Sequence, residues 1–294
     1  MTTATLDRTA LDRILPGSGT LSARPLPHGR FNTCWHVADA VSAHAYLLKL
    51  NDREGEAHLQ QMAAAMRSAR AGGVAVPEVL RVGSDPGLGP FLLQEWLDGR
   101  TFAEARQDHA IEADLWPRLG HQIALLHSIR PPRSLVATPA SRARQLSDLI
   151  DALIRHRLIP AALAEAAHRH GLLLAEQLGD LACVNTHQDI HPDNILIRPG
   201  GTIALLDFDH ANTAEYASDF VKPDRWCLSS ADDRQRMLDA YWQQRGEPAD
   251  PLFERRLAFH RLVITLSYFL YWHGRDPTQL PGCTAALRTE LERT

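Results

Sequence analysis

Lysine is scarce in this sequence, because only Lys49 and Lys222 occur among its 31 Lys and Arg residues. The chain has no lysine-rich stripe, and its formal net charge of −4 at pH 7 leaves no excess positive charge to neutralise phosphate backbones. We therefore expect no nucleic-acid partner. A lysine retained among so many arginines is itself a candidate for a position that requires a compact ammonium group.

Cysteine is also rare, and no apolar run is long. The 4 cysteines are scattered without a CxxC pair, which argues against a disulfide framework or a zinc ribbon. No stretch approaches the roughly 18 apolar residues of a membrane span, and the first residues lack the basic-then-apolar pattern of a leader. We expect a cytoplasmic protein without a membrane partner, present as a monomer or a homodimer.

The apolar pattern divides the chain into a strand-rich first third and a helical remainder. Residues 43–51 predict a strand that ends near Lys49, and residues 54–73 predict a long helix that two glycines terminate. Two more strands are expected before residue 97. After about residue 101 the spacing becomes helical. The helices expected there cover 113–129, 142–156, 160–178, 231–245, 252–272 and a short final segment near 283–293.

The stretch HQDIHPDNIL at 187–196 gathers polar side chains directly before a predicted strand. It is compatible with a metal site, a catalytic loop or an ordinary turn. A zinc protease carries its two histidines on a helix with a glutamate as base, whereas Pro192 disfavours a helical conformation at His191. No further ligand cluster stands out in the sequence. The zinc interpretation is therefore weaker than the catalytic-loop interpretation.

The spacing of three polar residues predicts phosphoryl transfer. This reaction requires a carboxylate that orients the attacking hydroxyl, and an amide with a second carboxylate that hold magnesium. Asp189 and Asn194 are five positions apart, as these two groups are in kinase-type loops. A predicted hairpin of strands 194–198 and 203–208 then brings Asp207 into position. We predict Asp189 as the catalytic residue, and Asn194 and Asp207 as the metal ligands.

Together, HQDIHPDNIL and LLDFDHA resemble the catalytic core of the aminoglycoside phosphotransferase and choline kinase superfamily, a branch of the protein-kinase-like fold. The resemblance implies a bilobal α+β fold. Residues 1–97 would form an N-lobe with a small antiparallel sheet, one long helix and the nucleotide site. Residues 98–294 would form a larger, mainly helical C-lobe with the catalytic loop, metal site and acceptor pocket. ATP or GTP, together with Mg²⁺, would be the cofactors.

The resemblance also assigns residues to nucleotide binding. Lys49 resembles the family's nucleotide-binding lysine at the end of the third strand, and Glu56 in the following helix is its expected ion-pair partner, with Glu54 as second choice. Such a pair would hold the ammonium against the α- and β-phosphates. A nucleotide-binding role for Lys49 agrees with the rarity of lysine in this sequence.

Two loops complete the expected nucleotide site. Gly29 to Asn32, in HGRFNTCW, resemble the phosphate-covering turn, where backbone amides would cradle the phosphates because only a single glycine is present. QEWLDG resembles the hinge between the lobes. The backbone groups of Glu95 and Leu97 are therefore expected to contact the base.

The sequence departs from the family pattern in the catalytic loop. Gln188 stands where the family usually has glycine, and Asp193 where a small residue is common. Asp209 in DFD could bind a second magnesium ion through water or brace the loop. Asp219 resembles a family aspartate that supports the catalytic loop, and we expect it to be structural.

We expect the acceptor to be a small molecule with a hydroxyl group. Segment 189–233 has nine acidic residues against three basic ones, so we expect a cationic acceptor. The leading hypothesis is a kinase that modifies an antibiotic or antibiotic-like compound. The alternatives are a metabolic kinase for choline, homoserine or a sugar, and a nucleotide-binding regulator without turnover. The intact set of Lys49, Asp189, Asn194 and Asp207 argues against such a regulator.

Overall fold

The structure is a computed structural model that describes residues 6, 8–16, 19–26, 33–51, 54–107 and 114–293. The contacts divide the chain into two compact units. The first unit contains residues 1–129, 189–212 and 229–245, and the second contains 130–188, 213–228 and 246–294. The predicted lobe boundary between residues 97 and 98 is a division by function and stays a prediction. None of the helices in the described ranges is both long and apolar enough to cross a membrane.

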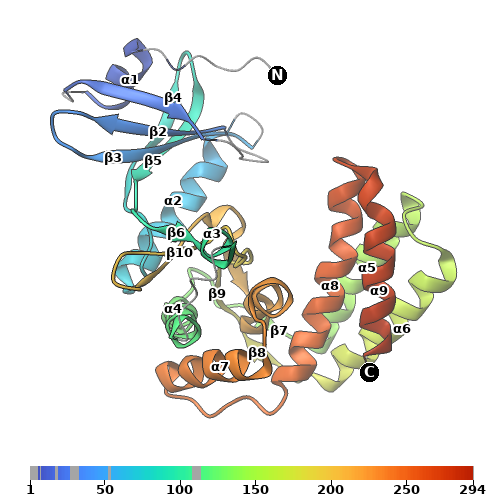
Figure 1. Ribbon diagram of the computed structural model, residues 1–294. Coiled ribbons are helices and arrows are strands. Elements are labelled where there is room, and N and C mark those ends of the chain that lie inside the picture. The colour runs from blue at the N-terminus through green and yellow to red at the C-terminus, as the bar shows by residue number, and fades with distance from the viewer. Residues whose placement is uncertain are drawn as a thin grey trace. The chain divides into compact units, whose positions relative to one another are not determined.

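A five-stranded antiparallel sheet forms the beginning of the first unit (Figure 1). Its strand order is β1-β2-β3-β5-β4, so the second hairpin folds back and puts β5 beside β3. The strands are β1 (Leu21–Pro25), β2 (Thr33–Asp39), β3 (Ala45–Leu50), β4 (Val79–Asp85) and β5 (Gly89–Glu95).

Each face of this sheet is covered by a helix. Helix α1 (Arg8–Ile14) packs with alternate residues of the central strands, including Leu48, Leu50 and Phe91. Helix α2 (Gly55–Ala71) buries Leu59, Met62, Ala63, Met66 and Ala69, which repeat at helical spacing. Side chains alternate along a strand, so Lys49, between two residues of the α1 face, points to the α2 face.

The rest of the first unit is a small sheet with helices. Strand β10 (Ile195–Ile197) pairs with β11 (Ile203–Leu205) and with β6 (Arg100–Thr101). Helix α4 (Leu115–Ser128) packs tightly against α7 (Ala231–Arg245), because a Cβ on Gly120 would lie 2.1 Å from the Met237 carbonyl oxygen. The remaining elements are α3 (Phe102–Gln107) and the 3₁₀ turn η1 (Phe208–His210).

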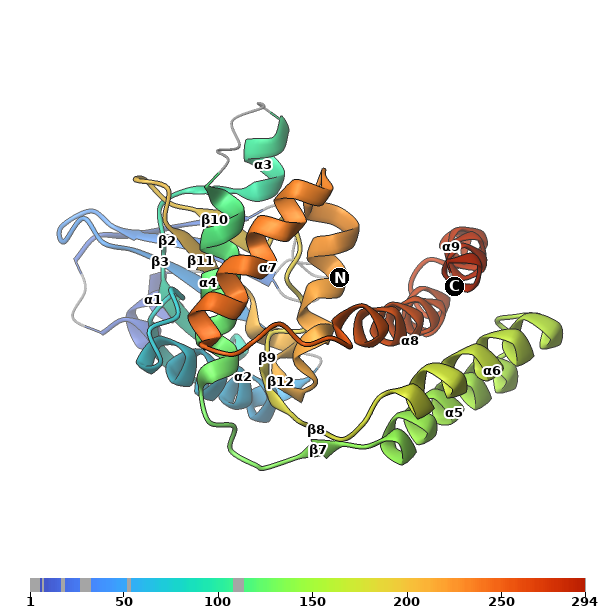
Figure 2. The same ribbon diagram turned by 90° about the horizontal axis from the view of Figure 1, so that it is seen from below.

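Four helices dominate the second unit. They are α5 (Pro139–Arg155), α6 (Ala161–Gln177), α8 (Phe253–His273) and α9 (Leu280–Glu292). Figure 2 shows α5 and α6 running side by side, and their apolar faces share a buried cluster with α8 and α9. Helix α5 begins with a capping box, in which Thr138 and Ser141 exchange hydrogen bonds. The shorter elements are β7 (Val136–Ala137), β8 (Leu181–Ala182), β9 (Val184–Thr186), β12 (Asn212–Ala214), η2 (Tyr216–Phe220), η3 (Pro223–Cys227) and η4 (Pro277–Gln279).

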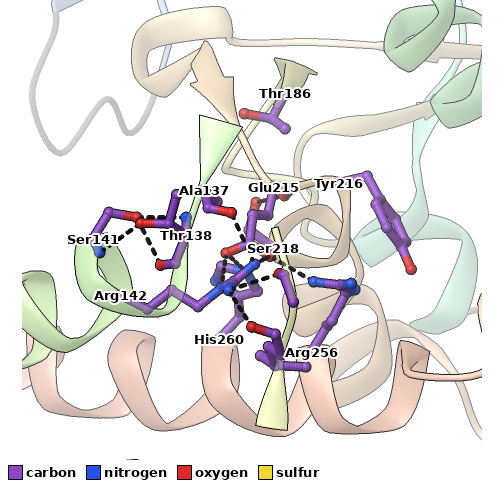
Figure 3. Close-up of polar contacts among 12 residues, drawn as sticks. Ala137, Thr138, Ser141, Arg142, Thr186, Glu215, Tyr216, Ser218, Arg256 and His260 are labelled. Carbon is purple, nitrogen blue, oxygen red and sulfur yellow. Dashed lines mark hydrogen bonds and ion pairs between the residues drawn. The ribbon is translucent and has the colours of Figure 1, made fainter. Parts of the chain in front are cut away.

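A buried ion cluster connects the ends of these elements (Figure 3). Arg142 at the start of α5 forms a bidentate pair with Glu215, at 2.7 and 2.8 Å. Arg256 of α8 approaches the same carboxylate to 3.3 Å and bonds to Asp250 at 2.7 Å. Burial would raise the pKa of Glu215, but His260 and Arg142 hold that pKa at about 2. Glu215 is therefore ionised at neutral pH and neutralised within the second unit.

Candidate active site

Asp219, an aspartate of the second unit, binds the two residues that precede Asp189. The two carboxylate oxygens of Asp219 accept hydrogen bonds from the backbone N–H groups of His187, at 2.8 Å, and Gln188, at 2.6 Å. Asp219 and His187 are both buried. The bonds of Asp219 satisfy backbone groups that have no strand partner. The structural role expected for Asp219 agrees with these bonds.

Gln188 has a left-handed backbone conformation, with φ at +64°. This conformation favours glycine, the residue that the family pattern has here. The side chain of Gln188 offsets the strain with two hydrogen bonds from its amide nitrogen, 2.8 Å to Thr186 Oγ1 and 2.6 Å to Ser218 Oγ. The chain therefore adopts at Gln188, without glycine, a conformation that glycine favours.

Within the first unit, the structure brings Asp189 and Asn194 together. Asn194 Nδ2 donates to the backbone oxygen of Asp189 at 3.0 Å and to its Oδ2 at 3.1 Å. The turn between them is closed by a hydrogen bond from Asn194 N to His191 O, and His191 Nε2 lies 3.5 Å from Asp189 Oδ2. The five-residue spacing thus produces the convergence that it predicts, and the asparagine fixes the orientation of the carboxylate.

The hairpin that follows brings the residue before Asp207 to the backbone of Asn194. Strands β10 and β11 pair Ile195 with Leu205, and Leu206 N donates to Asn194 O at 2.9 Å. Asp207 is the next residue and takes a left-handed conformation, with φ at +62°. A non-glycine residue in this region costs of order 1–3 kcal/mol and is typical of functional sites.

Lys49 lies against the same aspartate. Its Nζ atom is 2.6 Å from Asp207 Oδ1 and 3.0 Å from Asp209 Oδ2, and the side chain is only 5% exposed. Burial would lower the pKa of Lys49, but the two carboxylates more than offset this effect and raise it. The ammonium is therefore charged at neutral pH.

The expected ion pair between Lys49 and Glu56 is not formed in this structure. Glu56 is exposed, and its carboxylate accepts a hydrogen bond from Gln60 in the next turn of α2. Instead, Met62 Sδ is the α2 atom near Lys49, 3.7 Å from Nζ. Glu56 is six positions before Met62, so the two side chains lie about 120° apart around the helix axis. Glu54, the second choice, pairs with His58.

The hinge residues are placed at the end of β5. The Glu95 N–H donates to the Glu78 carbonyl, and the Glu95 carboxylate accepts from the Glu78 N–H. Trp96 N bonds to Ala45 O in β3. Leu97 follows outside the ladder, where its backbone N–H and C=O make no hydrogen bond with described residues. The Leu97 backbone groups are thus available to a ligand, whereas the Glu95 N–H is occupied by the sheet.

Gly29 and Asn32, expected in the phosphate-covering turn, lie outside the described residues. Strand β2 follows in the sequence, and its Cys34 is the register partner of Lys49. Burial raises the pKa of the Cys34 thiol to about 11, so this cysteine stays protonated and is a poor nucleophile at neutral pH.

The donor set suits a magnesium ion that also contacts phosphates. Asn194 donates through Nδ2, which leaves its amide oxygen without a hydrogen bond from a described residue. Asp207 contributes a carboxylate, and its side chain is 39% exposed. Hard oxygen donors of this kind, supplemented by phosphate oxygens and water, are what Mg²⁺ prefers. Among described residues, no group of three or more His, Cys, Asp or Glu could hold a metal by itself, so nothing supports the zinc interpretation.

Sequence reasoning finds Asp209 but not its contact with Lys49, and it misses His58 and Met62. Asp209 contacts Lys49 directly, and His58 and Met62 of α2 lie near these charges. A helical projection of residues 54–73 could have found them, because His58, Leu59, Met62 and Met66 lie on one face.

The chain was compared with known proteins in three ways. The sequence profile of the phosphotransferase enzyme family matches residues 22–259. A search of curated proteins found no match. Among solved structures, the chain is similar to a macrolide 2'-phosphotransferase from Brachybacterium faecium, with 18% identity, a TM-score of 0.69 and coverage of 95% of this chain and 96% of that chain.

Further solved structures have the same fold with other substrates in their names. A thermostable mutant of aminoglycoside phosphotransferase APH(4)-Ia, in a ternary complex with AMP-PNP and hygromycin B, is 14% identical, with a TM-score of 0.71 and coverage of 97% of both chains. An ethanolamine kinase from Plasmodium vivax is 14% identical, with a TM-score of 0.65 and coverage of 92% of this chain and 82% of that chain.

The profile match covers most of the sequence, and the chain therefore belongs to the phosphotransferase enzyme family. It is a phosphotransferase with an alcohol group as acceptor. The predicted bilobal, protein-kinase-like α+β fold is confirmed by the solved structures and by the five-stranded antiparallel sheet.

Proposed function

We propose that this protein is a small-molecule kinase that transfers the γ-phosphate of ATP or GTP to a hydroxyl of an antibiotic or antibiotic-like compound. The observation that carries the proposal is the continuous set of contacts from Asp189 through Asn194 and the β10–β11 hairpin to Asp207 and Lys49. These are the groups that phosphoryl transfer requires, joined in one unit of the chain.

Each residue has a distinct role in the proposal. Asp189, oriented by Asn194, accepts a hydrogen bond from the acceptor hydroxyl and positions it for attack. Asn194 and Asp207 would hold Mg²⁺, which supplies neutralisation of the charge on the phosphates when it is bound. Lys49 binds the α- and β-phosphates, and the backbone at Leu97 binds the base. Positioning and electrostatics supply the rate enhancement.

The similar structures support an antibiotic acceptor, since two are named for macrolide and aminoglycoside phosphotransfer. The resemblance to an ethanolamine kinase supports a second candidate, a metabolic kinase for an amino alcohol such as choline. A regulator without turnover would be expected to lack part of the site, and the contacts among Lys49, Asp189, Asn194 and Asp207 argue against this alternative.

The expected positive charge of the acceptor has less support than the charge count suggested. Among the acidic residues of segment 189–233, Asp207 and Asp209 contact Lys49, Glu215 contacts Arg142, and Asp224 contacts Arg261. Asp193, with a side chain 73% exposed, and Asp232 retain the exposure needed to attract a cation. We therefore propose a cationic acceptor on the strength of these exposed carboxylates rather than of the whole acidic count.

A screen of acceptor-stimulated ADP release tests this function. The purified protein, ATP and Mg²⁺ would be incubated with macrolides, aminoglycosides, nucleoside and peptide antibiotics, choline, ethanolamine, homoserine and sugars. We expect stimulation by one antibiotic class and resistance in a sensitive host that expresses the protein. Stimulation by an amino alcohol alone would support the metabolic kinase. Nucleotide binding without stimulation by any acceptor would contradict the proposal.

Asp189 provides the matched test of mechanism. Asp189→Asn keeps the shape of the side chain but removes the charge, so we expect kcat to fall by about 10²–10⁴-fold while nucleotide affinity stays within about twofold. Asp148→Asn, on an exposed face of α5, is the control that should leave both unchanged. Near-normal turnover of Asp189→Asn would show that another group orients the hydroxyl.

A further inference from the structure

A buried lysine needs a carboxylate partner that remains in place when nucleotide binds. Lys49 Nζ has two such partners here, Asp207 at 2.6 Å and Asp209 at 3.0 Å. In the proposed function, on which this inference rests, Asp207 turns an oxygen toward Mg²⁺ and its bond to Lys49 weakens. The phosphates then supply part of the counter-charge of the ammonium, and Asp209 is the carboxylate of this protein that continues to orient it.

Glu56 is poorly placed to become that partner. It is exposed, it bonds to Gln60, and it lies on a different side of α2 from Met62, the α2 residue nearest to Lys49. The sheet-facing side of α2 is fixed by buried Leu59, Met62 and Met66. In this orientation of α2, Met62 rather than Glu56 faces Lys49.

Asp209 has the properties that Glu56 lacks. Its side chain is 11% exposed, and it lies on η1 next to Phe208, which is 1% exposed and anchors the turn in the core. His58, on the side of α2 that carries Met62, brings Nε2 to 3.5 Å from Asp209 Oδ1 and to 2.9 Å from Glu54 Oε2. Asp209 thus contacts Lys49 of β3 directly and lies beside His58 of α2.

We propose that Asp209, supported by His58 of α2, is the residue that positions Lys49 for nucleotide binding in this protein. The connection between α2 and β3, expected as a direct Lys49–Glu56 pair, runs instead from His58 through Asp209 to Lys49. Asp207 is thereby released for the metal without loss of the lysine's counter-charge. Asp209 acts through Lys49 and is a positioning residue rather than a catalytic one.

Measurements of nucleotide affinity distinguish Asp209 from Glu56 as the residue that positions Lys49. Asp209→Asn removes the charge with little change in shape, and we expect the dissociation constant for ATP with Mg²⁺ to rise by about tenfold or more, since a hydrogen bond to a charged group is lost. Glu56→Gln is the matched control on α2 and should change it by less than about twofold. His58→Gln should have an intermediate effect. KM for ATP should rise more than kcat falls. An effect of Glu56→Gln as large as that of Asp209→Asn would overturn the proposal.

A second measurement does not depend on nucleotide. The chain has only two lysines, so ¹⁵N-lysine NMR gives two ammonium signals, which Lys222→Arg assigns. In nucleotide-free protein, Asp209→Asn should shift the Lys49 signal and accelerate its hydrogen exchange, whereas Glu56→Gln should not. An unchanged signal in folded Asp209→Asn protein would overturn the proposal. If the wild-type protein binds no nucleotide, the proposed function fails, and the NMR result still decides whether Asp209 holds Lys49.

Discussion

Two residues of the catalytic region have left-handed backbone conformations without being glycine. Gln188, at φ +64°, precedes the predicted catalytic aspartate, and Asp207, at φ +62°, is the predicted metal ligand. The surroundings hold both in place: Asp219 and the hydroxyls of Thr186 and Ser218 bind Gln188, and Lys49 binds Asp207. Strain of this kind persists only where other contacts determine the conformation.

Substitutions of Gln188 can separate backbone strain from side-chain bonding. Gln188→Ala loses both side-chain hydrogen bonds and keeps the strain, whereas Gln188→Gly loses the same bonds but relieves the strain. We expect Gln188→Ala to lower the free energy of unfolding by about 1 kcal/mol more than Gln188→Gly does. Urea denaturation measures both values. Equal values would mean that the backbone at Gln188 is not strained.

At the scale of elements, buried ion pairs and hydrogen bonds join the ends of helices α5, α6 and α8. Arg142 binds Glu215 and also donates to the carbonyl oxygens of Leu178 and Gly179, at the end of α6. Arg256 adds α8 to the same carboxylate. Glu215 in turn accepts, through its backbone oxygen, a hydrogen bond from Ser218, one of the partners of Gln188. The cluster therefore supports the approach to the catalytic loop within the second unit.

Glu215→Gln should destabilise the protein strongly. The variant leaves buried Arg142 without its counter-charge and Arg256 with Asp250 alone, and we expect the free energy of unfolding at pH 7 to fall by about 3–5 kcal/mol. Glu165→Gln, which removes the carboxylate of an exposed ion pair on α6, is the matched control and should cost less than about 1 kcal/mol. A cost for Glu215→Gln as small as that of the control would show that the cluster contributes little to stability.

The lowered pKa of Glu215 predicts that the free energy of unfolding depends on pH in the acidic range. The pKa of Glu215 is lowered from 4.5 to about 2 in the folded protein, so its stabilising contribution is complete above about pH 4.5 and is lost as the pH falls toward 2. This contribution is about 3 kcal/mol. The free energy of unfolding, measured between pH 6 and pH 2, should therefore fall less steeply for Glu215→Gln than for the wild-type protein. Parallel curves would contradict the assignment.

For the whole molecule, the two compact units divide the expected tasks. The residues proposed to bind nucleotide and metal, including Lys49, Leu97, Asn194 and Asp207, belong to the first unit. The second unit contains Asp219 and the buried ion cluster. Discontinuous segments build each unit, so the chain passes several times between them, and neither unit is a single stretch of sequence.

Hydrogen exchange should report this division. Mg²⁺ and ATP at about 100 times the dissociation constant stabilise the binding-competent state by about 2.7 kcal/mol. We expect amide exchange, measured by mass spectrometry, to slow first in segments 45–50 and 194–209, with little change in the helices α5 and α6. Lys49→Ala is the control that should abolish the protection. Protection confined to α5 and α6 would place the nucleotide elsewhere.

The sequence alone was sufficient to predict local features of this protein. The helix expected over 54–73 is α2 at Gly55–Ala71, and the hairpin expected at 194–208 is formed by β10 and β11. The meeting of Asp189 with Asn194 follows from the local turn, which the hydrogen bond from Asn194 N to His191 O closes. These features depend on interactions between residues close in sequence, and their signals are periodicity and spacing.

The partner of Lys49 was decided only by the tertiary structure. Which side of α2 faces β3 depends on how Leu59, Met62 and Met66 pack against the sheet, and this packing turns Glu56 to solvent and His58 toward Asp209. Asp209 is 160 positions from Lys49, so no local pattern could pair them. Rotation of a helix about its own axis is set by burial of its apolar face, and one sequence without its packed neighbours does not determine that angle.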